Sequence, residues 1–239
     1  MSVVFAAGFL VPQQVGPASY FRGVAAAFPG AFFPNVPTVA DIGGRANALA
    51  GQLQNVNGPI HIVAHSMAGL DSRYLLSQDL LGLRSSGKIA SLSMIATPNW
   101  GSPIADLLVG AQASVLAYRM LVHLADDLGL PAGALGNLTS GYIGKTFNPQ
   151  NPNAGNVDYY SYAGSGTALS LLKPAHAYID LVGQTADDKA NDGMVSVKSA
   201  AWTPLAEAAW PTDHLGEVGY DPTFDHIAAY RRILARAGA

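Results

Sequence analysis

Ser66 is the residue whose surroundings in this sequence most clearly favour chemistry. It stands in the stretch AHSMAG, between an apolar segment, 59–66, that predicts a buried strand and a segment, 67–81, that predicts a helix. Small residues beside a serine at such a turn let strand and helix nearly touch, so that the turn aims the hydroxyl out of the end of the sheet. An ordinary β-to-α turn with a buried serine fits the same five residues.

The turn departs from the G-x-S-x-G pattern that is usual for a nucleophilic serine in this position. Ala64 and Ala68 occupy the two glycine positions, and Gly69 follows one place later. Alanine at the first position is a familiar variant. At the second position the added methyl group is expected where strand and helix are most crowded.

A serine hydroxyl needs a base, and the base needs an orienting acid. For a serine on such a turn the chain order is serine, acid, histidine, so the base is sought among the last of the six histidines. His214, in the loop TDHLGEVGY, suits a base that reaches across the sheet edge, and we predict it as the base. His226 begins an amphipathic C-terminal segment, where capping or packing is the simpler role. The others fall in the strand, the turn, the inserted region or ahead of the acid: His61, His65, His123 and His176.

Asp192 is the predicted acid. It lies in ANDGMVSVKSA, at a turn before a segment whose β-branched residues predict a strand, although Asn-Asp-Gly is also a common plain turn. Asp187 and Asp188 belong to a polar stretch typical of a solvated surface, and Asp180 is a further alternative.

Two backbone N–H groups must face the oxyanion that forms when a serine attacks a carbonyl. We expect one from Met67, which follows the serine, and the other from Phe9, in the loop after the first strand, with Gly8 letting the backbone turn.

Strands alternate with helices along most of the chain, which indicates an α/β fold with a parallel sheet. We expect one domain over residues 1–239, with an insertion at about 101–156 that forms a lid or cap. The apolar stripe of this insertion offers Leu107, Leu108 and Val115 as substrate-facing candidates, and a helix simply packed on the core is the alternative. The predicted strands are 2–8, 59–66, 88–97 and 157–165, and the predicted helices are 18–28, 43–56 and 67–81.

The composition excludes several classes of partner. The formal net charge is −3 and no basic patch stands out, which argues against nucleic acid. Residues 104–125 are apolar but interrupted by polar and charged side chains, so they make a poor membrane span. The first residues lack a basic segment typical of a signal peptide, which predicts a protein that is cytoplasmic or secreted with its leader removed. The oligomeric state is not predicted.

Three motifs together resemble those of bacterial-type triacylglycerol lipases of the α/β-hydrolase superfamily. AHSMAGLDSRY resembles AHSMGGLDxRY of that family, IATPNWGSPIADLL resembles its TPHxGS segment, and DHLGEVG resembles its NHLDEVN histidine loop. NDGMVSVKSA is similar to its acid loop, and the spacing of 214 − 192 = 22 residues also matches. The resemblance covers roughly residues 1–108 and 157–230.

The resemblance implies a mostly parallel sheet flanked by helices, with an inserted helical lid. It implies a serine hydrolase that cleaves carboxylic esters of lipids through an acyl-enzyme, with Ser66 as nucleophile, Asp192 as acid and His214 as base. A lipid or ester substrate, met at a lipid–water interface, is the expected partner. The alternatives are a carboxylesterase or polyester hydrolase on short soluble esters without interfacial activation, an acyltransferase, and a non-catalytic hydrolase-like binding protein.

The chain departs from the family at two places. Ala7-Gly8 replaces a His-Gly pair common in the first loop, which predicts a changed oxyanion loop rather than an inactive enzyme. Many relatives bind a structural calcium through two aspartates, and the corresponding positions here are Gly216 and, near KPAHAYI, His176. Because calcium prefers several oxygen ligands, we expect no family-type calcium and no other cofactor.

Overall fold

The computed structural model describes residues 1–8, 17–38, 40–110, 135–167 and 170–239. In this part of the chain four strands form one parallel sheet in the order β1-β2-β3-β4. The strands are β1 (Ser2–Ala6), β2 (Ile60–His65), β3 (Ile89–Ile95) and β4 (Asp158–Tyr162), each close to its predicted position. Every residue of β2 is buried, as expected for a central strand covered on both faces.

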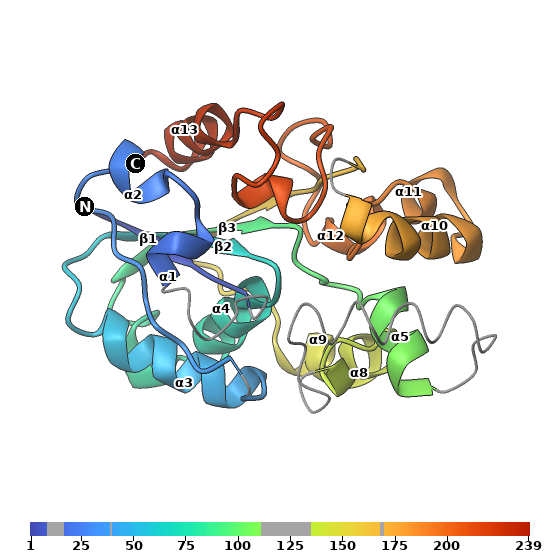
Figure 1. Ribbon diagram of the computed structural model, residues 1–239. Helices are drawn as coiled ribbons and strands as arrows, with labels where there is room; N and C mark the ends of the chain where they lie inside the picture. The colour runs from blue at the N-terminus through green and yellow to red at the C-terminus, as the bar shows by residue number, and fades with distance from the viewer. Residues whose placement is uncertain (9–16, 39, 111–134, 168–169) are drawn as a thin grey trace.

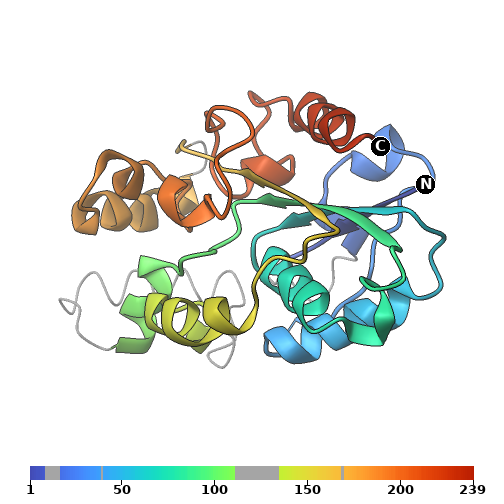
Figure 2. The same cartoon turned by 180° about the vertical axis from the view of Figure 1, so that it is seen from behind.

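Helices cover both faces of this sheet (Figures 1 and 2). The helices α3 (Ile42–Leu53) and α4 (Met67–Ser77) pack on one face, where their apolar side chains meet Val4, Ile62 and Met94 of the strands. The C-terminal helix α13 (His226–Ala237) covers the other face, where Tyr230 meets Phe5 and Val63. This two-sided burial is what an α/β domain requires of its sheet.

The helix predicted over 43–56 is α3, and Asp41 caps it by accepting a hydrogen bond from the Gly44 N–H at 2.7 Å. The helix predicted over 18–28 is instead two short helices, α1 (Pro17–Tyr20) and α2 (Val24–Ala27), because Gly23 adopts a φ of 76° between them.

The segment after Asp192 is not the predicted strand. Residues Val197–Ala200 form the short helix α12, and the Ser196 side chain caps it by accepting from the Ser199 N–H. Val195 and Val197 are buried in a small cluster with Ala163, so β-branched residues here serve packing rather than strand pairing.

A group of helices lies beyond the carboxyl ends of the strands, at the right of Figure 1, and both chain ends lie on the opposite side. Leu107 is buried against Ile179, whereas Leu108 is half-buried, and Val115 falls outside the described residues. No helix in the described ranges is both long and apolar enough to cross a membrane. The elements of this region are α5 (Pro103–Gly110), α8 (Ser140–Tyr142), the wider turn η2 (Ile143–Phe147), α9 (Asn148–Gln150), η3 (Ser170–Leu172), α10 (Lys173–Val182) and α11 (Ala186–Lys189), with α12.

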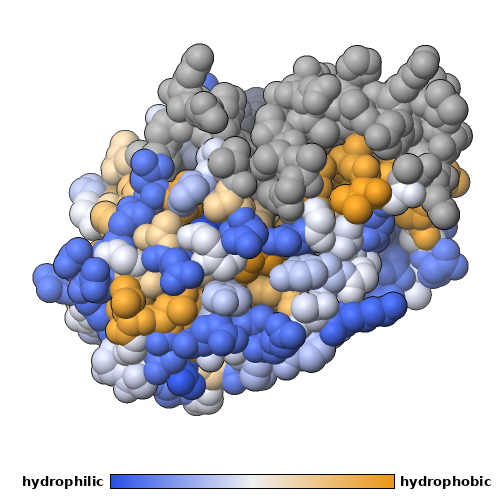
Figure 3. Space-filling model, turned by 90° about the horizontal axis from the view of Figure 1, so that it is seen from below, coloured by the Kyte–Doolittle hydropathy of each residue, from blue (hydrophilic) through white to orange (hydrophobic). Residues whose placement is uncertain are grey.

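The side chain of Asp106 joins two helices of the inserted region, α5 and α8. It accepts hydrogen bonds from the backbone N–H of Ser140 at 2.8 Å and from its hydroxyl at 2.7 Å, which fixes α8 against α5. Viewed from below, the surface mixes hydrophilic and hydrophobic areas, and one of the hydrophobic areas lies on the α5 and α8 side (Figure 3). Val109 of α5 is one of the large apolar residues exposed to solvent.

Candidate active site

Ser66 lies between the end of β2 and the start of α4, in a strained backbone conformation. Its φ of 59° and ψ of −134° are rare for a residue other than glycine, and such strain persists only where surrounding structure enforces it. The Gly8 backbone passes close by, since a Cβ added there would lie 2.8 Å from the Ser66 Cβ. Ser66 keeps 6% of its surface exposed.

The crowded position of the turn is Gly69 and not Ala68. A Cβ added at Gly69 would lie 2.0 Å from the Thr97 Oγ1, whereas the Ala68 methyl group packs in the apolar cluster beneath α3 and α4. Thr97 also donates its hydroxyl hydrogen to the Ser66 carbonyl oxygen at 2.9 Å. The expected crowding at Ala68 is therefore wrong, because strand and helix come closest one residue later.

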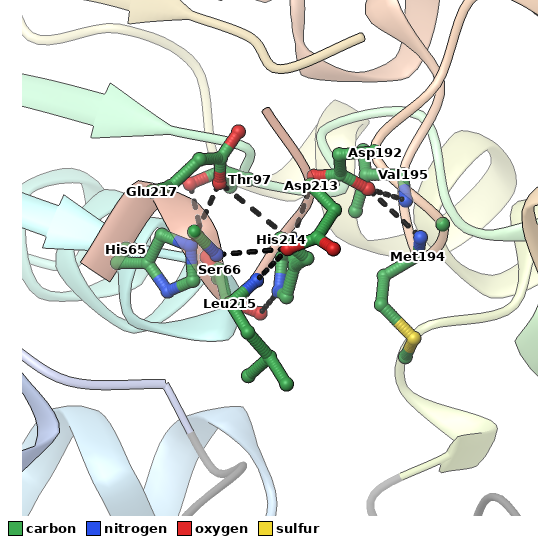
Figure 4. Close-up of polar contacts among 12 residues, drawn as sticks. His65, Ser66, Thr97, Asp192, Met194, Val195, Asp213, His214, Leu215 and Glu217 are labelled. Carbon is green, nitrogen blue, oxygen red and sulfur yellow. Dashed lines mark hydrogen bonds and ion pairs between the residues drawn. The ribbon is translucent and has the colours of Figure 1, made fainter. Parts of the chain in front are cut away.

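Ser66, His214 and Asp192 form one hydrogen-bonded row (Figure 4). His214 Nε2 lies 3.0 Å from the Ser66 Oγ, and His214 Nδ1 lies 2.7 Å from the Asp192 Oδ2. His214 and Asp192 are fully buried. The structure thus brings together the three residues that the sequence selected, although Ser66 and His214 are 148 positions apart in the chain.

The acid loop holds Asp192 as a hydrogen-bond acceptor. Its Oδ1 accepts from the backbone N–H of Met194 at 2.8 Å and of Val195 at 2.7 Å, so both carboxylate oxygens are used. The His214 backbone N–H also donates to the Asp192 carbonyl oxygen at 2.9 Å, which ties the two loops together. Ser102, at the start of α5, anchors the loop by donating to the Met194 carbonyl oxygen at 2.7 Å.

The alternative candidates for the base and the acid make other contacts or are exposed. His226 donates its Nε2–H to the Arg22 carbonyl oxygen at 2.7 Å, at the start of α13. Asp188 closes a capping box with Thr185 and pairs with Lys198, while Asp180 and Asp187 are exposed. His123 falls outside the described residues.

Of the two expected oxyanion donors, only Met67 is described. It is the first residue of α4, where backbone N–H groups lack an intrahelical acceptor, and its N–H has no backbone partner among the described residues. Phe9 falls outside the described residues, directly after Gly8.

Two buried charged residues near this site, Arg45 and Glu217, were not predicted from the sequence. Arg45 of α3 donates to the Asp71 Oδ2 at 2.8 Å and to the Ala7 carbonyl oxygen at 2.9 Å, so one guanidinium fixes the end of β1. Glu217 is fully buried, with its Oε2 2.9 Å from the His65 Nε2. The sequence carried one signal for both residues: a charged side chain beside or within an apolar stretch, Arg45 before ANALAGQL and Glu217 in HLGEVG.

No metal is required to explain how these groups approach one another. Among the described residues, His65, His214 and Glu217 are the one set of side chains whose ligand atoms lie within 4.8 Å of one another. Hydrogen bonds to each other, to Ser66, Asp192 and Tyr20 already account for that closeness.

The position of the family's calcium-binding aspartate is filled by other side chains. A Cβ added at Gly216 would lie 2.0 Å from the Thr212 Oγ1 and 2.6 Å from the Asp221 Cβ. Thr212 donates to the Asp221 Oδ2 at 2.8 Å, so a hydrogen bond occupies the space that a carboxylate at 216 would need.

Comparisons with known proteins agree with this architecture. No family model matches the chain. It is 30% identical over 194 residues to "Triacylglycerol lipase 2" of Saccharomyces cerevisiae, covering 77% of this chain and 56% of that protein, so the chain spans little more than half of this relative. It is 25% identical over 255 residues to "Triacylglycerol lipase" of Pseudomonas fragi, covering 87% and 84% of the two chains.

A solved structure shows the same fold. The mature Bacillus licheniformis lipase BlEst2 superposes with a TM-score of 0.74 at 23% identity, covering 98% of this chain and 91% of that one. The chain therefore has the α/β-hydrolase fold. Its curated relatives are named as triacylglycerol lipases, and its similarity to them and to bacterial lipases confirms the resemblance that the motifs predicted.

Proposed function

We propose that the protein hydrolyses carboxylic esters of lipids, as a triacylglycerol lipase, with Ser66, His214 and Asp192 as its catalytic triad. The observation that carries this proposal is the row of hydrogen bonds at 3.0 and 2.7 Å that ends on a serine in a strained strand-to-helix turn. Nucleophile, base and acid have the mutual geometry that acyl transfer needs.

The mechanism follows from these positions. His214 Nε2 takes the proton of the Ser66 hydroxyl as its Oγ attacks the acyl carbonyl, and Asp192 stabilises the resulting imidazolium through Nδ1–H. His214 then gives the proton to the departing alkoxide, which leaves the acyl group on Ser66. Water repeats the sequence, with His214 as base again, and releases the carboxylic acid.

The oxyanion that forms in each tetrahedral intermediate is held by backbone N–H groups. The Met67 N–H at the start of α4 suits this role, because helix N-termini favour negative charge. The second donor is Phe9, for which the close approach of Gly8 to Ser66 is the available support.

The region at 101–156 serves as a lid or cap within one domain of residues 1–239. Its described helices lie beyond the carboxyl ends of the strands, where α/β proteins bind ligands (Figure 1). Leu107 packs on α10, so of the described candidates Leu108 and the exposed Val109 are the better placed to meet lipid. A lipid surface is accordingly the expected partner.

The enzyme works without the family's calcium site and without another cofactor. The crowding at Gly216 supports this proposal, because no carboxylate fits where relatives place a ligand. Thr212 and Asp221 stabilise the histidine loop in its place.

The test is hydrolysis of an ester series from acetyl to long-chain acyl, including a triacylglycerol emulsion, with and without a chelator. Ser66→Ala should abolish all turnover. Ser72→Ala is the matched control, because it removes a buried hydroxyl of the same helix that only bonds the Ala68 carbonyl oxygen. Loss in Ser66→Ala alone, with emulsion activity indifferent to chelator, supports a calcium-independent lipase.

Other outcomes separate the alternatives. Turnover confined to short soluble esters would make the protein a carboxylesterase. Activity that survives in Ser66→Ala would overturn the proposal. Binding of esters without turnover in the wild type would mean a non-catalytic relative.

A further inference from the structure

Glu217 is a buried carboxyl group that has no role in the proposed mechanism. It is fully buried, and its Oε2 lies 2.9 Å from the His65 Nε2 and 3.8 Å from the His214 Nδ1 (Figure 4). Its other oxygen, Oε1, is buried without a hydrogen-bond partner among the described residues, against the backbone of Gly164. A charged carboxylate in such a place would need more donors than it has.

The two carboxyl groups beside His214 have opposite surroundings. Asp192 accepts three hydrogen bonds, from His214 and from the backbone N–H groups of Met194 and Val195. Glu217 has one side-chain partner within hydrogen-bond distance, the His65 Nε2, and the backbone N–H of Gly164 lies beside its carboxyl group. The hydrogen-bond donors of this site therefore gather on Asp192, and few are left for Glu217.

The titratable groups around Glu217 offer it no positive charge. Burial raises its pKa well above the usual range, Asp192 and Asp213 raise it further, and the backbone N–H of Gly164 lowers it by less. Burial and His214 hold the pKa of His65 well below its usual range, so His65 is neutral too. The groups that face Glu217 are His65 of β2, Tyr20 of α1, Tyr230 of α13, and Asp192, Asp213 and His214 of the two loops.

His65 can accept the proton that a neutral Glu217 would donate. Its Nδ1 lies 2.5 Å from the Tyr20 hydroxyl, and its Nε2 is left to face Glu217. The His65 ring also packs against the His214 ring, with centroids 4.5 Å apart. Glu217 therefore fixes His65, and His65 fixes one face of the His214 ring.

We propose that Glu217 remains a protonated carboxylic acid during the reaction, donates its proton to His65 Nε2, and acts as a neutral positioning residue for His214. This rests on the proposed function, in which His214 is the base. With Glu217 neutral, Asp192 alone accepts the His214 Nδ1–H. A second ionised carboxylate at 3.8 Å would compete for that hydrogen and turn the ring away from Ser66.

The first test compares Glu217→Gln with Glu217→Leu on a soluble ester. Glutamine has the shape of the protonated acid and can donate to His65, so kcat should stay within about threefold and the pH profile of kcat/KM should superimpose on that of the wild type. Leucine leaves the His65 nitrogen unpaired, so kcat should fall about tenfold with KM little changed. A loss in Glu217→Gln as large as that in Asp192→Asn would overturn the proposal, because it would make Glu217 a second ionised acid.

The second test reads the proton directly and needs no activity. The infrared spectrum of the wild type at neutral pH, minus that of Glu217→Gln, should contain the carbonyl stretch of a protonated carboxylic acid. A difference that contains only carboxylate bands would overturn the proposal, whatever the kinetics show. Should Ser66→Ala retain activity, the proposed function would fail while this spectrum still decides the state of Glu217, so the two failures are distinguishable.

Discussion

Two aspartates, Asp71 and Asp192, are fully buried and each is paired with a basic side chain, yet they are held in different ways. Asp192 in the acid loop meets His214 and two backbone N–H groups. Asp71 in α4 meets Arg45, while its Oδ1 is buried with no hydrogen-bond partner among the described residues. Asp192 keeps two backbone hydrogen bonds in either protonation state of His214. Asp71 has Arg45 as its one hydrogen-bond partner among the described residues.

This difference separates a chemical role from a structural one. His214 gains and loses a proton in the proposed mechanism, so the acid beside it must stay charged in both states, and fixed N–H donors ensure this. Arg45 takes no part in proton transfer, and its guanidinium joins Asp71 to the carbonyl oxygens of Ala7 and Pro37. In the proposed mechanism the Asp192 pair therefore serves the reaction, whereas the Asp71 pair holds backbone carbonyl groups.

Asp192→Asn should produce the largest effect, on activity and not on stability. The amide presents a donor to His214 or to the loop N–H groups, which favours the wrong imidazole tautomer, and in a comparable triad this change lowers kcat by about 10⁴-fold. Ester hydrolysis and the melting temperature would be measured together, with Asp188→Asn as the control. Activity above a tenth of the wild type would show that Asp192 is not the acid.

Arg45→Met should act in the opposite way, mainly on stability. Removing one partner of a buried ion pair leaves the other charge uncompensated, at a cost of about 3–5 kcal/mol in the free energy of unfolding. Denaturant unfolding would measure it, and the double variant Arg45→Met/Asp71→Leu is the control, since an apolar pair of similar volume should recover most of the loss. Equal loss in both variants would mean that the contacts to Ala7 and Pro37 dominate.

Asp71 should make the free energy of unfolding depend on pH. Burial raises its pKa from 3.8 to about 6, more than Arg45 lowers it. The folded protein then binds a proton more tightly than the unfolded chain does, so this group makes stability fall as pH rises from about 4 through 6, by roughly 1.4 kcal/mol for each unit of pKa difference. Unfolding free energies measured across that range should lose this slope in Arg45→Met/Asp71→Leu. An unchanged slope would assign it to another group, such as Glu217.

The sequence predicted which three side chains would meet better than it predicted the elements around them. Ser66, Asp192 and His214 were selected because nucleophile, acid and base must follow a known order on this kind of turn, and His214 was preferred to His226 on loop position alone. The four strands were placed because buried parallel strands are continuous apolar runs. These signals are local, so a single chain displays them.

What the sequence could not predict depends on residues that meet across the fold. Arg45 and Asp71 are 26 positions apart, and Glu217 reaches His65 across 152 positions, so no local pattern pairs them. The segment after Asp192, predicted as a strand, is a short helix. The Ser196 side chain caps this helix, and Val197 is buried in an apolar cluster with Ala163. The sequence pattern predicted that the turn at Ser66 is most crowded at Ala68. The crowded position is Gly69, because the Thr97 side chain, which follows β3, lies against it.

That last difference gives the smallest prediction. Ala68→Gly restores the glycine after the serine in the G-x-S-x-G pattern, but the Ala68 methyl is buried in the apolar cluster, so we expect no gain in ester hydrolysis. The cost should be that of glycine within a helix, about 0.5–1 kcal/mol. Ala46→Gly in α3 is the matched control, because it removes a methyl from the same cluster far from Ser66. Equal losses of stability with unchanged activity would make Ala68 a core residue, whereas a change of kcat in Ala68→Gly alone would mean that its methyl shapes the oxyanion site after all.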